Sequence, residues 1–256
     1  MQLHNSSKGI CGKEPFTGEI LKIDLGISDR KASMIISTDQ YMIRSQNDNN
    51  IYWEQEIYPD WTTLSAYRHF PNGMPGTGVE PHYHDNDELW LFTEGVGEVW
   101  LDGERFDITP NTMVYTPMGC IHRFQMFTPY ENNAIVTRLE RQRRPIHVTT
   151  EEYGPPEPTV PGFVVPGNSN TGPIADPGSR CPLSEWHMMT LSSGISAEEA
   201  ILSVNEHLLV MTGTILLGID GWTIELTSHE VALLRAGTRR QLSSGTNARV
   251  LVARER

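Results

Sequence analysis

Short, largely apolar runs, separated by turn signals, recur along most of the chain. The runs are rich in β-branched and aromatic residues, which is typical of strands; examples are Glu88–Phe92, Glu98–Leu101, Met113–Thr116 and Ala134–Leu139. Turn-forming residues such as Asp102–Gly103 stand between them. The pattern Ser196–Ile201 predicts at most a turn or two of helix. Many short, closely spaced strands predict an all-β sandwich or barrel.

One stretch departs from this pattern. Between Pro145 and Pro182 the chain is rich in proline and glycine, with PPEP at 155–158 and VPG at both 160–162 and 165–167. Proline fixes φ and cannot donate to a sheet, so residues 146–181 are expected to form an extended connector. Phe163–Val165 is apolar enough to be held against a barrel. The connector separates a predicted N-terminal domain, 1–145, from a C-terminal domain, 182–256.

An internal repeat relates the two predicted domains. A shift of 118 residues places turn and strand landmarks of the first domain on those of the second: Gly76 on Gly194, Glu88 on Glu206, Gly95 on Gly213, Asp102–Gly103 on Asp220–Gly221, and Gly119 on Gly237. Glycine supplies the positive φ that tight turns require. The chain is therefore predicted to contain two copies of one β unit.

A candidate metal site lies in the first repeat. Residues i and i+2 of a strand face the same side, so His82 and His84 project together. After the turn Asp85–Asp87, Glu88 begins the next strand, and a Pro–Gly turn delivers His122. Three imidazoles and one carboxylate suit one divalent ion per chain (Fe, Mn, Ni, Co or Zn), and an octahedral ion keeps two adjacent positions open.

These residues resemble the two sequence motifs of the cupin superfamily. Gly76–Gly95 matches G-x5-HxH-x3-E-x6-G at each fixed position, and Asn111–Met126 is similar to G-x5-PxG-x2-H-x3-N. Asn111 replaces a glycine there, which asparagine tolerates because it also adopts left-handed conformations; Met126 replaces an asparagine. The resemblance implies two cupin barrels (double-stranded β-helix, jelly-roll-like) and metal ligation by His82, His84, Glu88 and His122.

The second repeat lacks the metal motif. The shift of 118 residues places Ala200, Leu202 and Arg240 where the first repeat has its three histidines, and of the four ligands only the glutamate recurs, as Glu206. Arg240 is a candidate partner for Glu206. The second barrel is therefore predicted to bind no metal and to be a structural or dimerisation half.

Composition limits the partners. The formal net charge is −12, which disfavours nucleic acid and anionic membrane surfaces. The cluster Arg138, Arg141, Arg143 and Arg144 is interpreted as a solvated strand end, or alternatively as a patch that steers an anionic substrate. Three widely spaced cysteines form no disulfide framework. No signal peptide or transmembrane run is present, so a cytoplasmic location is expected.

The function predicted is that of a metal-dependent cupin enzyme acting on a small, oxygen-rich metabolite. The sequence contains no GxSxG, P-loop or dinucleotide-binding motif, so catalytic residues beyond the metal ligands stay unassigned. The resemblance favours an Fe/Mn-type oxygenase; a redox-neutral isomerase, epimerase or lyase acting on a sugar-derived or keto-acid substrate, and a non-enzymatic small-ligand-binding module, remain alternatives. Strand parity makes Trp90, Tyr115 and Met126 candidate pocket residues, and exposed sheet edges favour a homodimer.

Overall fold

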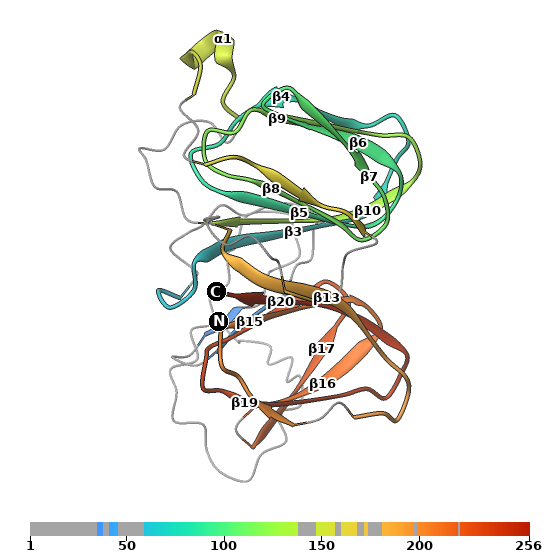
Figure 1. The fold of residues 1–256 in the computed structure, drawn as a ribbon. Helices are drawn as coiled ribbons and strands as arrows, with labels where there is room; N and C mark the ends of the chain where they lie inside the picture. Colours follow the sequence, from blue (N-terminus) through green and yellow to red (C-terminus); the bar gives the residue numbers. More distant parts are fainter. Residues whose placement is uncertain are drawn as a thin grey trace, which may run out of the picture. The chain divides into compact units, whose positions relative to one another are not determined.

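The computed structural model describes residues 35–37, 41–45, 59–137, 147–156, 160–167, 172–173, 181–196, 199–219 and 221–256, and these divide between two compact units (Figure 1). One unit lies within Asn49–Ser184. The other contains Glu185–Arg256 together with two strands from the N-terminal segment, β1 (Ile35–Ser37) and β2 (Tyr41–Ser45). The predicted all-β class is confirmed.

Two antiparallel sheets form the N-terminal unit. One has the order β11-β8-β5-β10-β3 and the other β4-β9-β6-β7. The strands are β3 (Leu64–Gly73), β4 (Gly78–His82), β5 (Glu88–Glu94), β6 (Gly97–Leu101), β7 (Glu104–Ile108), β8 (Thr112–Thr116), β9 (His122–Met126), β10 (Tyr130–Thr137) and β11 (Phe163–Val165). The connector contributes β11, a short helix α1 (Thr150–Tyr153) and a two-residue strand β12 (Gly172–Pro173).

The C-terminal unit repeats this plan. Its strands are β13 (Leu183–Leu191), β14 (Ala200–Ile201), β15 (Glu206–Thr212), β16 (Thr214–Ile219), β17 (Trp222–Thr227), β18 (Glu230–Leu234), β19 (Arg239–Ser243) and β20 (Ala248–Glu255). The sheets have the orders β1-β2-β18-β15-β20-β13-β12, in which β12 comes from the connector, and β14-β19-β16-β17. Strands β5, β8 and β10 correspond to β15, β18 and β20 at a shift of 118 residues.

The turn geometry confirms the repeat. Positive φ occurs at equivalent glycines, for example 77° at both Gly76 and Gly194 and 89° at both Gly103 and Gly221. Asn111 adopts φ 69°, and His229, which is 118 residues later, adopts φ 70°. Asn111 therefore takes the left-handed conformation expected of a residue that replaces glycine.

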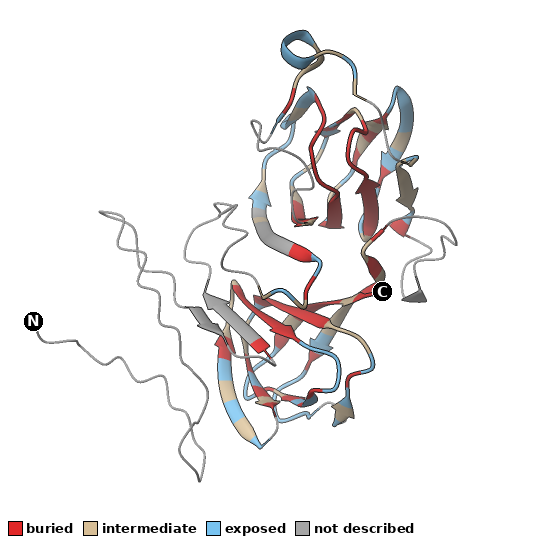
Figure 2. Cartoon of the chain, turned by 90° about the vertical axis from the view of Figure 1, so that its left-hand side faces the viewer, coloured by how far each residue is buried: buried red, intermediate tan, exposed pale blue. Residues whose placement is uncertain are grey.

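Each unit has its own apolar core between its sheets, and in Figure 2 the buried residues follow the strands. In the N-terminal unit, alternate residues of neighbouring strands meet there: Trp90, Phe92, Val99, Leu101, Val114, Phe124, Met126 and Ala134. The equivalent cluster of the C-terminal unit includes Leu208, Val210, Leu217, Leu226 and Val250. Strands β6 and β9 bury alternate residues, whereas β5 and β8 are buried along almost their whole length.

At equivalent strands of the two units, β8 and β18, segments from different parts of the chain pair as an additional strand. In the N-terminal unit β11 of the connector pairs with β8, through Phe163↔Tyr115 and Val165↔Met113. In the C-terminal unit β2 pairs with β18, through Tyr41↔Leu234. Both pairings satisfy a sheet edge that would otherwise be open. The predicted limits 1–145, 146–181 and 182–256 differ from this arrangement, because β1 and β2 belong to the C-terminal unit and part of the connector belongs to the N-terminal sheet.

Two local expectations need correction. Ala200–Ile201 is strand β14 rather than helix, because its backbone pairs with Arg239 and Arg240 of β19. Phe163–Val165 is a paired strand rather than only an apolar part of an extended connector. The arginine cluster 138–144 lies outside the described residues.

Candidate metal centre

The four predicted ligands come from three strands and one loop that converge at one end of the N-terminal barrel. His82 ends β4 and lies directly opposite His122, the first residue of β9. Glu88 begins β5 between Thr116 of β8 and Val136 of β10. His84 follows β4 in the loop that leads to β5, and its carbonyl accepts a hydrogen bond from the amide of Gly119 (3.0 Å). The Pro–Gly turn is thereby tied to the ligand loop.

Asp87, next to Glu88, holds the two motifs together. Its carboxylate accepts hydrogen bonds from the backbone amide of Met118 (2.8 Å) and the hydroxyl of Tyr115 (2.9 Å). Its backbone amide donates to the hydroxyl of Thr137 (3.0 Å) at the end of β10. A buried carboxylate that accepts several hydrogen bonds fixes the surrounding loops, so the approach of Glu88 to the histidines is set by this network.

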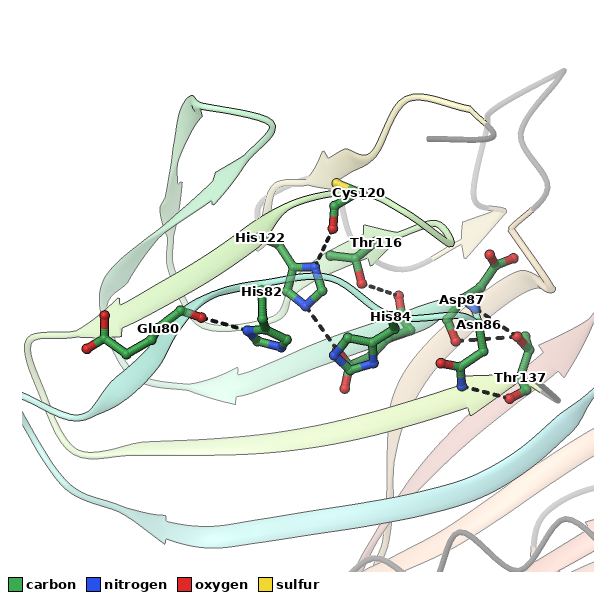
Figure 3. A network of polar contacts seen from close by, with 10 residues as sticks. Glu80, His82, His84, Asn86, Asp87, Thr116, Cys120, His122 and Thr137 are labelled. Carbon is green, nitrogen blue, oxygen red and sulfur yellow. Dashed lines mark hydrogen bonds and ion pairs between the residues drawn. The ribbon is translucent and has the colours of Figure 1, made fainter. Parts of the chain in front are cut away.

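The imidazoles of His82, His84 and His122 point toward one another (Figure 3). Their ring centroids are 4.4 Å apart for His82–His122, 4.9 Å for His82–His84 and 5.0 Å for His84–His122. The Oε2 atom of Glu88 lies 3.4 Å from Nε2 of His122 and 3.7 Å from Nε2 of His84. All four side chains are buried.

Hydrogen bonds orient two of the rings with the other nitrogen facing the centre. Nδ1 of His82 lies 2.6 Å from the carbonyl of Glu80, and Nδ1 of His122 lies 2.8 Å from the carbonyl of Cys120. A carbonyl only accepts, so each Nδ1 carries the proton and each Nε2 presents a lone pair. Nε2 of His122 and Oε2 of Glu88 are buried and make no hydrogen bond with the described residues. Buried atoms of this kind fit a metal ion, which would satisfy both.

The protonation states also suit a cation. Burial, aided by His122, lowers the pKa of His82 to about 4, against the opposing effect of its hydrogen bond to Glu80. Burial likewise lowers the pKa of His84 to about 3, although Glu88 acts in the other direction. For Glu88 burial is the largest influence and raises the pKa, but His84 and His122 outweigh it and hold the pKa at about 2. At neutral pH His82 and His84 therefore offer neutral imidazoles and Glu88 a carboxylate, the states that bind a dication.

A fourth histidine, His147 of the connector, also lies at this centre. Its ring centroid is 4.2 Å from that of His82 and 5.6 Å from that of His84. The ligand atoms within 4.8 Å of one another fall into two groups that share His84: His84, Glu88 and His122, and His82, His84 and His147. The sequence analysis missed His147, because a single histidine beyond the last strand carries no ligand spacing.

A cavity of about 320 Å³ opens beside the ligands, with apolar walls along its length. The lining residues are Phe70, Gly78, Val79, His82, Glu88, Trp90, Phe124, Tyr130, Asn132, Ala134 and His147. The ring of Trp90 lies 5.0 Å from that of His122. Asn132 is buried, and within the described part of the chain its Oδ1 makes no hydrogen bond.

Of the three predicted pocket residues, the structure places Trp90 in the cavity and the other two away from it. Tyr115 is fully buried behind the sheet, where its ring packs 5.2 Å from Phe163 of β11. Met126 is fully buried in the core against Gly97, where a Cβ would lie 2.7 Å from its sulfur. Phe124 lines the cavity as well. Arg123 is exposed and stacks 3.9 Å above the Trp100 ring.

The equivalent place in the C-terminal unit holds an ion pair. Ala200 and Arg240 face each other across β14 and β19, as His82 and His122 do in the N-terminal unit. The Arg240 guanidinium donates two hydrogen bonds to the fully buried Glu206 carboxylate, at 2.8 and 3.1 Å, and Arg254 donates a third at 2.9 Å. Glu206 accordingly raises the pKa of Arg254, although burial, the largest influence, opposes this. The ion-pairing expected between Glu206 and Arg240 is present.

Comparison with known proteins relates one segment of the chain to a family. A model of the cupin domain matches residues 73–128, the segment that contains all four predicted ligands. The predicted resemblance to cupins is thus supported for the N-terminal barrel. Among curated proteins, the uncharacterised protein y4oW of Sinorhizobium fredii is 29% identical over 85 residues, which is 33% of this chain and 39% of that protein. The match thus spans well under half of the relative's length.

Solved cupin structures resemble the whole chain in fold. A Bacillus subtilis oxalate decarboxylase, whose Mn(II) centres have been studied, aligns with a TM-score of 0.61 at 15% identity, over 94% of this chain and 78% of that one. A formate complex of Lactobacillus farciminis oxalate decarboxylase aligns with a TM-score of 0.58 at 13% identity, over 94% and 88%. The expected pair of cupin barrels is thus confirmed. Among the described residues, no helix has the length and apolarity needed to cross a membrane.

Proposed function

We propose that this cupin is a metal-dependent enzyme that binds one divalent first-row ion through His82, His84, Glu88 and His122. The observation that carries the proposal is the convergence of these four buried side chains, of which His82 and Glu88 line a cavity. Neutral imidazoles and a carboxylate suit Mn or Fe, and the fold similarity to Mn(II)-containing oxalate decarboxylase supports the same choice. Such an ion supplies redox chemistry with dioxygen or, without a redox change, Lewis acidity.

The cavity favours a substrate with an apolar body and oxygen atoms at one end. Trp90, Phe124 and Val79 would contact the body, while the oxygen atoms would lie near Glu88 and the histidines. A charged group as small as oxalate would leave most of these walls uncovered, and an ion held against apolar walls is costly. Cavities of about 300–1,000 Å³ accept larger organic molecules. An aromatic or branched oxo- or hydroxy-acid fits this description better than oxalate or a sugar.

Asn132 would bind the end of the substrate that lies farthest from the metal ligands. It lies opposite Phe92, and Val136, four residues along β10, lies opposite Glu88. Four residues of strand span about 13 Å. The Oδ1 atom of Asn132 accepts hydrogen bonds, so it would select a hydroxyl or amino group at that distance from the ligands.

An oxygenase is the favoured reaction, because the cupin resemblance favours an Fe- or Mn-type centre, which can react with dioxygen. The redox-neutral isomerase, epimerase or lyase reaction is the alternative. The test is metal analysis of the purified chain, followed by oxygen-uptake measurements with a panel of aromatic and branched oxo- and hydroxy-acids. Turnover accompanied by oxygen uptake and abolished by Glu88→Gln is expected.

Three results would change this assignment. Equal turnover under strict anaerobiosis would replace the oxygenase with a redox-neutral enzyme. Binding of panel acids without any conversion would leave a non-enzymatic ligand-binding module. A chain that binds no divalent first-row metal would overturn all the metal-dependent readings. A homodimer also remains a prediction, which light scattering tests directly.

A further inference from the structure

The connector is fixed to the strand segment that carries the metal ligands. Val148 and Tyr83 form an isolated antiparallel bridge with both backbone hydrogen bonds at 3.0 Å. Val148 is fully buried, and the hydroxyl of Tyr83 donates to the carbonyl of Gly154 (3.3 Å), also in the connector. Tyr83 is the residue between His82 and His84. The connector therefore meets the chain at the centre of the HxH pair.

This bridge determines where His147 lies. Because neighbouring residues of an extended chain face opposite sides, the burial of Val148 on one side leaves His147 facing the other, toward His82 and His84. The exposed side chain of His147 lines the mouth of the cavity, and its ring is 4.2 Å from that of His82. Three chain segments far apart in sequence, the HxH segment, β9 and the connector, thus bring four histidines together.

The spacing of the ligand atoms fits coordination to one ion. Around an octahedral ion with bonds of about 2.1 Å, adjacent ligand atoms are about 3 Å apart and opposite ones about 4.2 Å. The ligand atoms of His82, His84 and His147 lie within 4.8 Å of one another, and those of His84, Glu88 and His122 meet the same limit. Because His84 is common to the two groups, a single ion beside His84 is within reach of both after small side-chain rotations.

We propose that His147 is a fifth protein ligand of the metal, supplied by the connector. The inference rests on the proposed metal binding by the other four residues. His147 would take one of the two positions that they leave open, so that one position remains for an exogenous ligand. A substrate that binds through two oxygen atoms would then have to displace His147, and the exposure of this side chain leaves room for it to swing away.

The test uses Mn(II) as the probe with the full chain, the His147→Ala variant and a matched control, His187→Ala. His187 is a half-buried histidine of the C-terminal unit, outside the candidate centre. Pulsed electron paramagnetic resonance on chains labelled with ¹⁵N-histidine counts the imidazoles bound to Mn(II), and competition with a chelator measures the affinity. Four imidazoles are expected in the unsubstituted chain and in the control, and three in His147→Ala.

The affinity should fall at least about tenfold in His147→Ala, since even the loss of a residue that supports a ligand has an effect of that size. His147→Asp should recover most of the affinity, because a carboxylate also binds Mn(II). Three imidazoles in the unsubstituted chain, with an unchanged affinity in His147→Ala, would refute the role of His147 and leave the four-residue site intact. An unsubstituted chain that binds no Mn(II), Fe(II) or other first-row dication would overturn the proposed function as well.

Discussion

The buried carboxylate of the C-terminal unit provides a quantitative test of how the two barrels differ. Glu206 is fully buried and accepts hydrogen bonds from two guanidinium groups, those of Arg240 and Arg254. Arg240 is only 8% exposed, whereas the side chain of Arg254 is 32% exposed and also pairs with Glu185. Arg240 thus depends on Glu206, while Glu206 has a second partner.

This asymmetry predicts unequal effects of the two single substitutions. Glu206→Ala leaves the Arg240 guanidinium buried and unpaired, and removal of one partner from a buried pair costs about 3–5 kcal/mol of unfolding free energy. Arg240→Ala leaves Glu206 paired with Arg254, so its cost should be nearer that of a lost charge-assisted hydrogen bond, about 1.5–3 kcal/mol. The double variant Glu206→Leu/Arg240→Leu removes both charges, and it should be less destabilised than Glu206→Ala.

The assay must separate the two units, because a two-domain chain need not unfold in a single transition. Hydrogen exchange followed by mass spectrometry on peptides from β15 and β20 reports opening of the C-terminal unit, and peptides from β5 and β10 serve as an internal control. If Arg240→Ala lowers the free energy of unfolding as much as Glu206→Ala does, Arg254 does not compensate the charge of Glu206. If Glu206→Ala lowers the free energy of unfolding by less than about 1 kcal/mol, the Arg240 guanidinium must be solvated in the variant, contrary to its burial.

Three further predictions concern the N-terminal unit. Glu88→Gln should lower Mn(II) affinity at least about tenfold, since it removes the one charged ligand, and a chelator competition measures this. The metal-free chain should lose stability as the pH falls from 6.5 toward 4. The folded-state pKa of His82 is about 4 and that of His84 about 3, so the unfolded chain binds more protons than the folded chain in this window. Urea titrations from pH 7.5 to 4.5 that show no loss of unfolding free energy would contradict those pKa values. Asn132→Leu should raise KM for a substrate bearing a distal hydroxyl by about 10-fold or more, with a smaller effect on the analogue without that group, and equal KM changes for both compounds would remove Asn132 from recognition.

The convergence of the four candidate ligands and the repeat could be predicted because their signals are local. Side chains at i and i+2 of a strand share a face, so HxH specifies two convergent imidazoles before any long-range contact is known. Turn residues with positive φ are also encoded locally, which is why Gly76 and Gly194, or Asn111 and His229, mark equivalent corners of the two units. The sequence therefore contained both the number of barrels and the identity of the one with histidines.

The residues that line the cavity could not be predicted from strand parity alone. Met126 shares the inner face of β9 with His122, but it lies four residues along the strand, where Gly97 leaves room for its side chain in the core. Tyr115 pairs with Leu89 on the outer face of the sheet, where β11 covers it. His147 and Asn132 reach the cavity through pairings of distant segments, Val148 with Tyr83 and β10 with β5. Neither pairing has a local signature.

The two barrels bury equivalent glutamates but differ in the groups that can balance the negative charge. Each places a buried glutamate at the start of equivalent strands, β5 and β15, and each must compensate its charge. In the C-terminal unit two arginines do so, from positions equivalent to His122 and Val136. In the N-terminal unit those positions hold His122, whose imidazole is neutral when it binds metal, and the apolar Val136. Neither carries a positive charge, so a bound dication could supply the two positive charges that the arginines supply in the C-terminal unit. Guanidinium groups donate hydrogen bonds but offer no lone pair, so Arg240 and Arg254 cannot bind a metal, and the proposed metal chemistry would belong to the N-terminal barrel.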